Sequence, residues 1–463
     1  MLEQWQGLVG VVAIGLVAAL ASENRAAIRA RVVLACFALQ VGIAVLVLYV
    51  PLGKTALAAA STAINTLLGY TNAGIDMVFG GLAADELGYS FFIRVLPVII
   101  FFAALMEVLY HLRIMPFIVK WGGRALRRVT ATRPIESLNV VANMFVGQVE
   151  APLSLKPYLP GISRFELFTI MVSGLASIAG SVMAGYISLG VSAELLVAAA
   201  FMSAPGGLLM AKLIMPEPVQ ASHGMRAEST VASVTTADRP LASVGAASAS
   251  DMDQDVTGSV LTVSDQTDLG VDSPDDGLAA FTDKAPPREH TNVIMAAAAG
   301  AQNGTAIAIA VAAMLIAFVS LIALANGLLG WAGGLAGFEG LTVQTVFGAV
   351  FAPLMWAIGV PWAEAAQAGA LFGEKVVLNE FVAYISLTQQ AGELSPRTVT
   401  LMTFALCGFA NLSSIGILLG GLGTIIPERK PEIARLGLKA VFAASLANLM
   451  SAALAGLVLG SSL

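Results

Sequence analysis

Two short polar stretches interrupt long apolar segments of the chain, and they contain the side chains with the greatest capacity for chemistry. Residues 147–152 include Gln148 and Glu150, and residues 378–384 include Glu380. An acidic side chain at membrane depth costs about 2.5–3.5 kcal/mol on insertion scales, so it normally faces a wet cavity or a partner. The two carboxylates therefore predict a functional site built from two halves.

Other polar and aromatic residues predict what such a site would bind. Carboxylates accept hydrogen bonds from hydroxyl groups, and the amides of Gln148 and Asn411 pair with donors and acceptors alike. Ser414 adds a hydroxyl group, and Phe409 or Phe381 adds a flat apolar wall. This combination suits a neutral polyhydroxyl ligand.

The same polar groups also have a purely structural interpretation. They could cap the ends of interrupted helices and satisfy the backbone groups that an interruption frees. We favour capping for Asn379 and Ser413. The cost of burying a charge favours a functional role for Glu150 and Glu380.

A cation site is a second hypothesis. Asn143 and Ser177 are hard oxygen donors, and with the exposed carbonyls of a broken helix they could hold Na⁺. The same residues suit plain backbone capping equally well, so spacing alone leaves both possibilities open.

The composition indicates that these segments belong to a membrane protein. Of the 463 residues, 57% are hydrophobic and 12% are charged, and the mean hydropathy is +0.83. A soluble globular protein would have about 25% charged residues, so we expect a polytopic membrane protein. The first apolar run has no small-residue cleavage site and further apolar runs follow, which predicts a retained helix and not a removed signal.

Charge and cysteine content narrow the function classes further. A net charge of −6 argues against a nucleic-acid partner, which would require a basic face. Cys36 and Cys407 both lie in apolar runs, without the spacing of a metal site or a disulfide framework. The three histidines are scattered, which argues against a histidine-ligated metal. We therefore expect no cofactor.

Apolar runs of about 20 residues predict about eight transmembrane helices. They lie at residues 7–21, 32–51, 91–110, 165–191, 194–213, 304–333, 397–422 and 433–459. The connections alternate in charge, and basic connections are cytoplasmic by the positive-inside rule. An even number of spans then places both termini in the periplasm.

Four segments do not fit simple spans. Residues 112–129 are basic and amphipathic, which predicts an interfacial helix, and 340–358 is its possible counterpart. Residues 135–160 and 360–385 are apolar but interrupted by Gly, Pro and polar residues. Half of such a segment, about 12 residues, rises only ~18 Å against a ~30 Å hydrocarbon core, which predicts two re-entrant hairpins.

The order of hairpin, interrupted span and span occurs twice, and polar patches at 177–181 and 411–416 interrupt the two spans. Such an inverted repeat is typical of secondary transporters. We predict an all-α protein with five regions. These are the scaffold helices and interfacial helix (1–134), the first hairpin with its spans (135–217), a loop (218–291), a scaffold span with an interfacial helix (292–358), and the second hairpin with the last two spans (359–463).

Residues 218–291 are rich in Ser, Thr, Ala and Asp. This composition cannot bury a core and predicts a disordered, acidic cytoplasmic loop. A solvated, tolerated insertion is favoured over a regulatory element.

Several motifs together resemble the concentrative nucleoside transporter family, in family order and over nearly the whole chain outside the acidic loop. They are the stretches 147–152 (GQVEAP), 203–207 (SAPGG), 359–365 (GVPWAEA), 373–375 (GEK), 379–384 (NEFVAY) and 407–416 (CGFANLSSIG).

The resemblance implies a homotrimer in which each protomer has a scaffold and a mobile transport domain. It implies that Gln148 and Glu150 meet the nucleobase with Val182 packing on it, and that Glu380, Asn411 and Ser414 hold the ribose while Phe409 packs on the sugar or base. It implies that Na⁺ is ligated by Asn143, Ser177 and the carbonyls of Val146 and Ile178. Val149 departs from the usual Thr or Ser of the family, which leaves the base preference open.

The sequence therefore predicts a sodium-driven nucleoside symporter of a bacterial inner membrane, and not an enzyme. A proton-coupled symporter is the first alternative, since some bacterial members resemble proton-driven carriers. An intramembrane enzyme with Glu150 and Glu380 as an acid/base pair is a rival. A nucleoside sensor that signals through the acidic loop is a third possibility.

Overall fold

The structure, a computed structural model, describes residues 2–83, 91–153, 155–218, 290–335, 337–338 and 340–460. By its contacts the chain divides into one unit of residues 1–218 and 286–463 and another of residues 219–285. The acidic segment lies, apart from its ends, outside the described residues. The described residues form helices and contain no strand, which confirms the all-α fold.

The first part of the chain forms six helices. They are α1 (Leu2–Leu20), α2 (Ala30–Leu48), α3 (Pro51–Phe79), α4 (Phe91–Arg94), α5 (Leu96–His111) and α6 (Ile114–Thr130). Helix α6 confirms the predicted amphipathic helix at 112–129. Helix α3 was not predicted, because its Thr, Asn, Ala and Gly residues dilute the apolar signal over 29 residues.

The first half of the repeat contains a short hairpin followed by a broken span. Its helices are α7 (Pro134–Asn143), α8 (Glu150–Leu153), α9 (Arg164–Ala176), α10 (Gly180–Ser188) and α11 (Ala193–Ile214). The second half begins after α14 (Val293–Leu335) and α15 (Val343–Ala357). Its helices are α16 (Trp362–Val377), α17 (Glu380–Gln390), α18 (Pro396–Leu406), α19 (Ser413–Gly420), α20 (Leu422–Ile425) and α21 (Lys430–Leu459).

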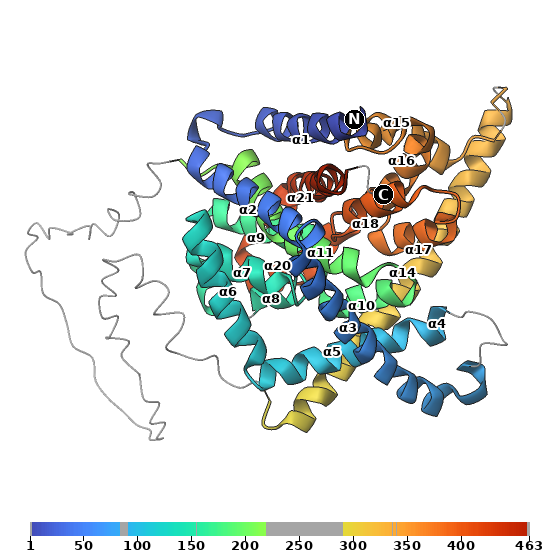
Figure 1. Cartoon of the computed structure of the whole chain (residues 1–463). Helices are drawn as coiled ribbons and strands as arrows, with labels where there is room; N and C mark the ends of the chain where they lie inside the picture. Colours follow the sequence, from blue (N-terminus) through green and yellow to red (C-terminus); the bar gives the residue numbers. More distant parts are fainter. Residues whose placement is uncertain are drawn as a thin grey trace, which may run out of the picture. The chain divides into compact units, whose positions relative to one another are not determined.

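Among the described residues, six helical stretches are long and apolar enough to cross a membrane, or seven if the pair α15 and α16, bent by 117°, counts as one. The predicted span at 7–21 is a shorter apolar helix within α1, and the one at 397–422 is interrupted. Helix α14 runs beside α5 (Figure 1). Most of α14 is exposed, whereas the most apolar stretch of α21 is largely buried among its neighbours.

In each broken span, the first helix begins with a serine cap and ends at a polar interruption. The Ser163 hydroxyl accepts from the Glu166 backbone at the start of α9, and the Ser395 hydroxyl accepts from the Thr398 backbone at the start of α18. These bonds satisfy backbone donors that a helix start leaves free. Residues 177–179 separate α9 from α10, and residues 407–412 separate α18 from α19. The fold therefore exposes backbone carbonyls at both interruptions.

Candidate substrate and ion site

Glu380 is the centre of a buried hydrogen-bond cluster. It begins α17 and is 5% exposed. The hydroxyl of Tyr186, from α10, donates to its Oε1 at 2.8 Å, and the Nδ2 of Asn411 donates to its Oε2 at 2.8 Å. Each carboxylate oxygen thus has a donor, as a buried carboxylate requires. The second hairpin, α10 and the interruption after α18 therefore meet at the carboxylate of Glu380.

A local network fixes the orientation of Asn411. Its Oδ1 accepts from the Ser413 hydroxyl at 2.7 Å and from the Ser414 backbone amide at 2.8 Å. The amide group therefore has its nitrogen toward Glu380. The hydroxyl oxygen of Ser414 is buried without a partner, which leaves one polar group beside Asn411 available to a ligand.

The second arm of the second hairpin, α17, begins with a cap, as expected. Asn379 Oδ1 accepts from the Val382 backbone at 2.9 Å, which confirms capping for that residue. Ser413, for which capping was also expected, instead donates its hydroxyl to the side chain of Asn411. Its contribution is to orient the amide that holds Glu380.

The first hairpin contributes a second set of polar groups. Gln148 is 5% exposed, and its Oε1 has no hydrogen-bond partner. Glu150 is exposed, and its Oε2 accepts from the Gly147 backbone at 2.8 Å. Val149 lies against Gly421, which follows α19, so the hairpin turn also contacts the second repeat half. Val182 is buried in α10.

The two carboxylates are not direct partners. Among the contacts of the described residues, none joins Glu150 to Glu380, because Glu150 bonds within its own hairpin turn while Glu380 bonds to Tyr186 and Asn411. An acid/base pair needs both carboxylates aligned on one substrate bond.

The residues predicted to bind a cation lie at the first hairpin turn and the first interruption. Asn143 is completely buried and its Oδ1 has no partner, while its Nδ2 donates to the Asn139 carbonyl at 3.0 Å. The Ser177 hydroxyl donates to the Ser173 carbonyl at 3.0 Å, so its oxygen lone pairs remain available. Val146 and Ile178 are buried at the turn and the interruption.

Backbone bonds join the turn and the interruptions. The amide of Gly180 donates to the Phe145 carbonyl at 3.0 Å, which ties the first hairpin to the first interruption. The amide of Phe409 donates to the Ser177 carbonyl at 3.3 Å, which ties the two interruptions together. Phe409 is half-buried. The candidate ion ligands and the Glu380 cluster therefore belong to one connected assembly.

Lys375 has neutral partners. Its ammonium group contacts the Ala405 carbonyl and the Asn448 side chain, each at 2.7 Å, and not a carboxylate. Glu364, in the same hairpin, accepts from the backbone and hydroxyl of Ser395. The carbonyls freed by a helix interruption supply acceptors that a sequence pattern does not reveal.

Glu107 pairs with a histidine that is distant in sequence. Glu107 Oε1 lies 2.8 Å from Nε2 of His290, at the start of the segment that leads into α14. A partner so distant in sequence leaves no local sequence pattern from which the contact could be predicted.

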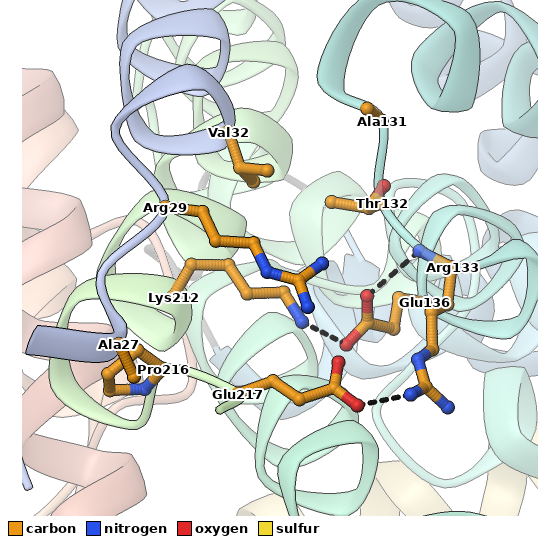
Figure 2. A pocket seen from close by; sticks show the side chains of 10 residues that line it. All are labelled: Ala27, Arg29, Val32, Ala131, Thr132, Arg133, Glu136, Lys212, Pro216 and Glu217. Carbon is orange, nitrogen blue, oxygen red and sulfur yellow. Dashed lines mark hydrogen bonds and ion pairs between the residues drawn. The ribbon is translucent and has the colours of Figure 1, made fainter. Parts of the chain in front are cut away.

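A separate charged cavity of about 40 Å³ lies where α2, α7 and α11 approach one another (Figure 2). Arg133 pairs with Glu217 and with Glu166 at 3.3 Å, and Lys212 pairs with Glu136. Burial lowers the pKa of Arg133, but the carboxylates of Glu166, Glu217 and Glu136 outweigh this and raise it above its usual value. The charges of this cavity largely satisfy one another, so it is a structural network.

We expect Glu136→Gln to lower stability strongly. The side chain of Glu136 is 0% exposed and that of Lys212 is 12% exposed, and removing one partner of a buried pair costs about 3–5 kcal/mol. Glutamine keeps an acceptor for the Arg133 backbone, so the helix cap survives. Thermal unfolding in detergent measures the effect. Glu432→Gln, at a more exposed pair with Arg429, should cost less than about 1 kcal/mol. Equal losses would contradict a buried-charge penalty.

Comparison with known families decides what kind of protein contains this assembly. A profile described as "Na+ dependent nucleoside transporter C-terminus" matches residues 195–456. Its companion, "Na+ dependent nucleoside transporter N-terminus", matches residues 9–82, and a "Nucleoside recognition" profile matches residues 92–193. The chain belongs to the concentrative nucleoside transporter family.

Bacterial relatives of this concentrative nucleoside transporter match along nearly their whole length. An uncharacterized transporter of Haemophilus influenzae is 44% identical over 98% of this chain and 97% of its own. The nucleoside permease NupC of Helicobacter pylori is 39% identical over 98% and 97%. CNTnw in an inward-facing substrate-bound state is 41% identical, with a TM-score of 0.81 over 98% and 99% of the two chains.

Family membership settles the broad class. This concentrative nucleoside transporter is a membrane protein that carries nucleosides and is not an enzyme. Among its described residues, no group of three or more His, Cys, Asp or Glu side chains could hold a metal ion. The side-chain oxygens of Asn143 and Ser177 are neutral, a ligand type that suits Na⁺ in transporters.

Proposed function

We propose that this protein is a symporter that imports nucleosides, driven by the Na⁺ gradient, with alternating access around a site near the middle of the membrane. The observation that carries the proposal is the buried Glu380 cluster, where a hairpin helix and an interrupted span present a carboxylate, an amide and the unpartnered hydroxyl of Ser414. Such a set of acceptors and donors matches the hydroxyl groups of a ribose.

The proposed substrate contacts divide between the two hairpins. Glu380, Asn411 and Ser414 hold the ribose hydroxyls. Gln148 and Glu150 meet the nucleobase, and the unpartnered Oε1 of Gln148 supports this role. The apolar side chains Val149, Val182 and Phe409 pack against the substrate. Because Val149 offers no hydroxyl, base choice depends on the remaining polar groups of the first hairpin.

The proposed Na⁺ ligands are the side-chain oxygens of Asn143 and Ser177 and the carbonyls of Val146 and Ile178. The support is chemical. A fully buried amide oxygen without a partner is costly unless a ligand satisfies it, and Asn143 has such an oxygen. Loading the cation orders the first hairpin turn and so raises nucleoside affinity, and the coupling is reciprocal.

The proposed assembly is a homotrimer in the bacterial inner membrane, with both termini in the periplasm. Each protomer has a scaffold of residues 1–134 and 292–358 and a transport domain of residues 135–217 and 359–463. The exposed apolar length of α14 supports a surface covered by lipid or by neighbouring protomers.

Uptake of radiolabelled uridine and adenosine into proteoliposomes tests the function. We expect accumulation with an inward Na⁺ gradient and none with an H⁺ gradient alone. Accumulation with H⁺ alone would favour the proton-coupled alternative and remove the ion role of Asn143 and Ser177. No accumulation of any nucleoside under either gradient would contradict the proposed function.

We expect Tyr186→Phe to weaken nucleoside binding about tenfold, because a hydrogen bond to a charged group contributes about 1.5–3 kcal/mol and substrate hydroxyls replace part of it. Phenylalanine keeps the ring packing against Phe381 and Tyr384, whose ring centroids lie 5.0 and 4.6 Å away. Titration calorimetry measures the affinity. Tyr384→Phe is the matched control, since its hydroxyl bonds to the Thr403 carbonyl and not to Glu380. A larger loss in the control would contradict the role of Tyr186.

A further inference from the structure

Lys375 is a fully buried cation for which the proposed transport cycle has no role. Its Nζ contacts the Ala405 carbonyl and Oδ1 of Asn448, each at 2.7 Å. A buried ammonium group requires such partners. The side chain comes from α16, the first arm of the second hairpin, and it reaches the end of α18, where the second span is interrupted.

Asn448, in α21, holds both interruptions at once. Its Nδ2 donates to the Ala176 carbonyl at 2.8 Å and to the Cys407 carbonyl at 2.6 Å, so its Oδ1 must face the ammonium group. Gly408 permits this approach. Its φ is +147°, and a Cβ there would lie 2.6 Å from the Ala176 oxygen and 2.7 Å from Asn448 Oδ1.

The two repeat halves are in register around this point. The same number of residues separates three pairs of positions: Ser163 and Ser395, Gly180 and Leu412, and Asn143 and Lys375. The first pair caps α9 and α18. The second pair donates backbone hydrogen bonds to the preceding hairpin, at 3.0 Å to the Phe145 carbonyl and at 3.1 Å to the Val376 carbonyl. The capping residues and the two donors keep this spacing, while the acceptors Phe145 and Val376 are one residue closer together, so the alignment holds to within one residue in the hairpin.

The third pair is where the halves differ in chemistry. Asn143 presents a buried amide oxygen without a partner, and Lys375 presents an ammonium group. The carbonyl that Lys375 contacts, Ala405, has the same spacing from Ser173, whose carbonyl accepts from Ser177. One half therefore offers oxygen ligands at the point where the other half provides a cation.

We propose that Lys375 is a built-in cation, which occupies in the second half the role that Na⁺ takes in the first, so that the second half binds no coupling ion. The idea rests on the proposed function. An ammonium group, like Na⁺, neutralises the carbonyl dipoles exposed at a helix interruption, and its three N–H groups reach several acceptors. The number of coupling ions is then one for each nucleoside.

The wild-type protein gives the first test. The reversal potential of uridine flux in proteoliposomes yields the number of charges that move with each uridine. We expect one, and two would overturn the proposal. Na⁺-dependent flux that moves two charges would leave the proposed function standing and overturn this inference alone, whereas flux that does not depend on Na⁺ would overturn the proposed ion role and, with it, this inference.

Replacing Lys375 with the corresponding residue of the first half gives a sharper test. Lys375→Asn supplies the ligand of the first half, so we expect the Hill coefficient for Na⁺ to rise from about one toward two. Lys375→Met supplies no ligand, so uptake should be lost at every Na⁺ concentration. Wild-type Na⁺ dependence in both variants would overturn the proposal.

Asn143→Lys is the reciprocal variant, and it decides the question if the Lys375 variants do not fold. The installed ammonium group should make nucleoside binding independent of Na⁺, measured by titration calorimetry in Na⁺ and in choline. Binding that still requires Na⁺ would overturn the proposal.

Discussion

Glu380→Gln is expected to abolish nucleoside uptake while the protein still folds and reaches the membrane. Both oxygens of Glu380 accept hydrogen bonds, from Tyr186 and from Asn411. Glutamine replaces one acceptor with an N–H₂ group, which would face a donor, and it removes the charge that holds a ribose hydroxyl. Hydrogen bonds to charged groups contribute about 1.5–3 kcal/mol each, so the affinity should fall about 100-fold or more.

The measurement is uridine uptake in proteoliposomes together with calorimetric binding in detergent. Glu374→Gln is the matched control, because Glu374 is a buried carboxylate of the same hairpin, at 4% exposure, that bonds to Gln344 and lies outside the Glu380 cluster. Its uptake should remain close to that of the wild type. Normal uptake by Glu380→Gln would remove Glu380 from the substrate site.

Asn143→Ala is expected to uncouple nucleoside binding from Na⁺. The variant loses a completely buried side-chain oxygen at the first hairpin turn that has no protein partner. Coupling between two sites typically amounts to about 5- to 150-fold in affinity, and this enhancement by Na⁺ should disappear. Nucleoside affinity then stays at its low, Na⁺-free value at every Na⁺ concentration.

Titration of uridine at a series of Na⁺ concentrations measures this loss. Asn139→Ala, one turn earlier on α7, is the matched control. Asn139 is also buried and donates to the Ser173 hydroxyl at 2.9 Å, but no ion role is assigned to it. This variant should lose stability and retain its response to Na⁺. If Asn143→Ala responds to Na⁺ like the wild type, its oxygen is not an ion ligand.

Much of this architecture could be predicted from sequence because its interruptions are chemically conspicuous. Gly, Pro and polar residues at 147–152 and 407–416 stand out against apolar surroundings, and they correspond to the first hairpin turn and the second interruption. Helix α3 was missed because its composition gives neither a continuous apolar run nor a clear break.

The partners inside the site were harder to predict. Tyr186 bonds to Glu380 from a distant helix, and a tyrosine in an apolar segment is typical of a packed core. Lys375 and Asn448 depend on carbonyls that become available only when helices stop. Backbone acceptors have no residue type, so sequence patterns do not reveal them.

The bond from the Phe409 amide to the Ser177 carbonyl bears on the order in which the ligands arrive. Under the proposed roles, Ser177 contacts the ion and Phe409 contacts the substrate. A single backbone hydrogen bond therefore links ion binding to substrate binding. If the ion binds at Ser177 first, it fixes the position of the Phe409 side chain before the nucleoside enters. At limiting Na⁺ the KM for nucleoside should then rise while the maximal rate holds, which is the kinetic pattern of a carrier that loads its cation first.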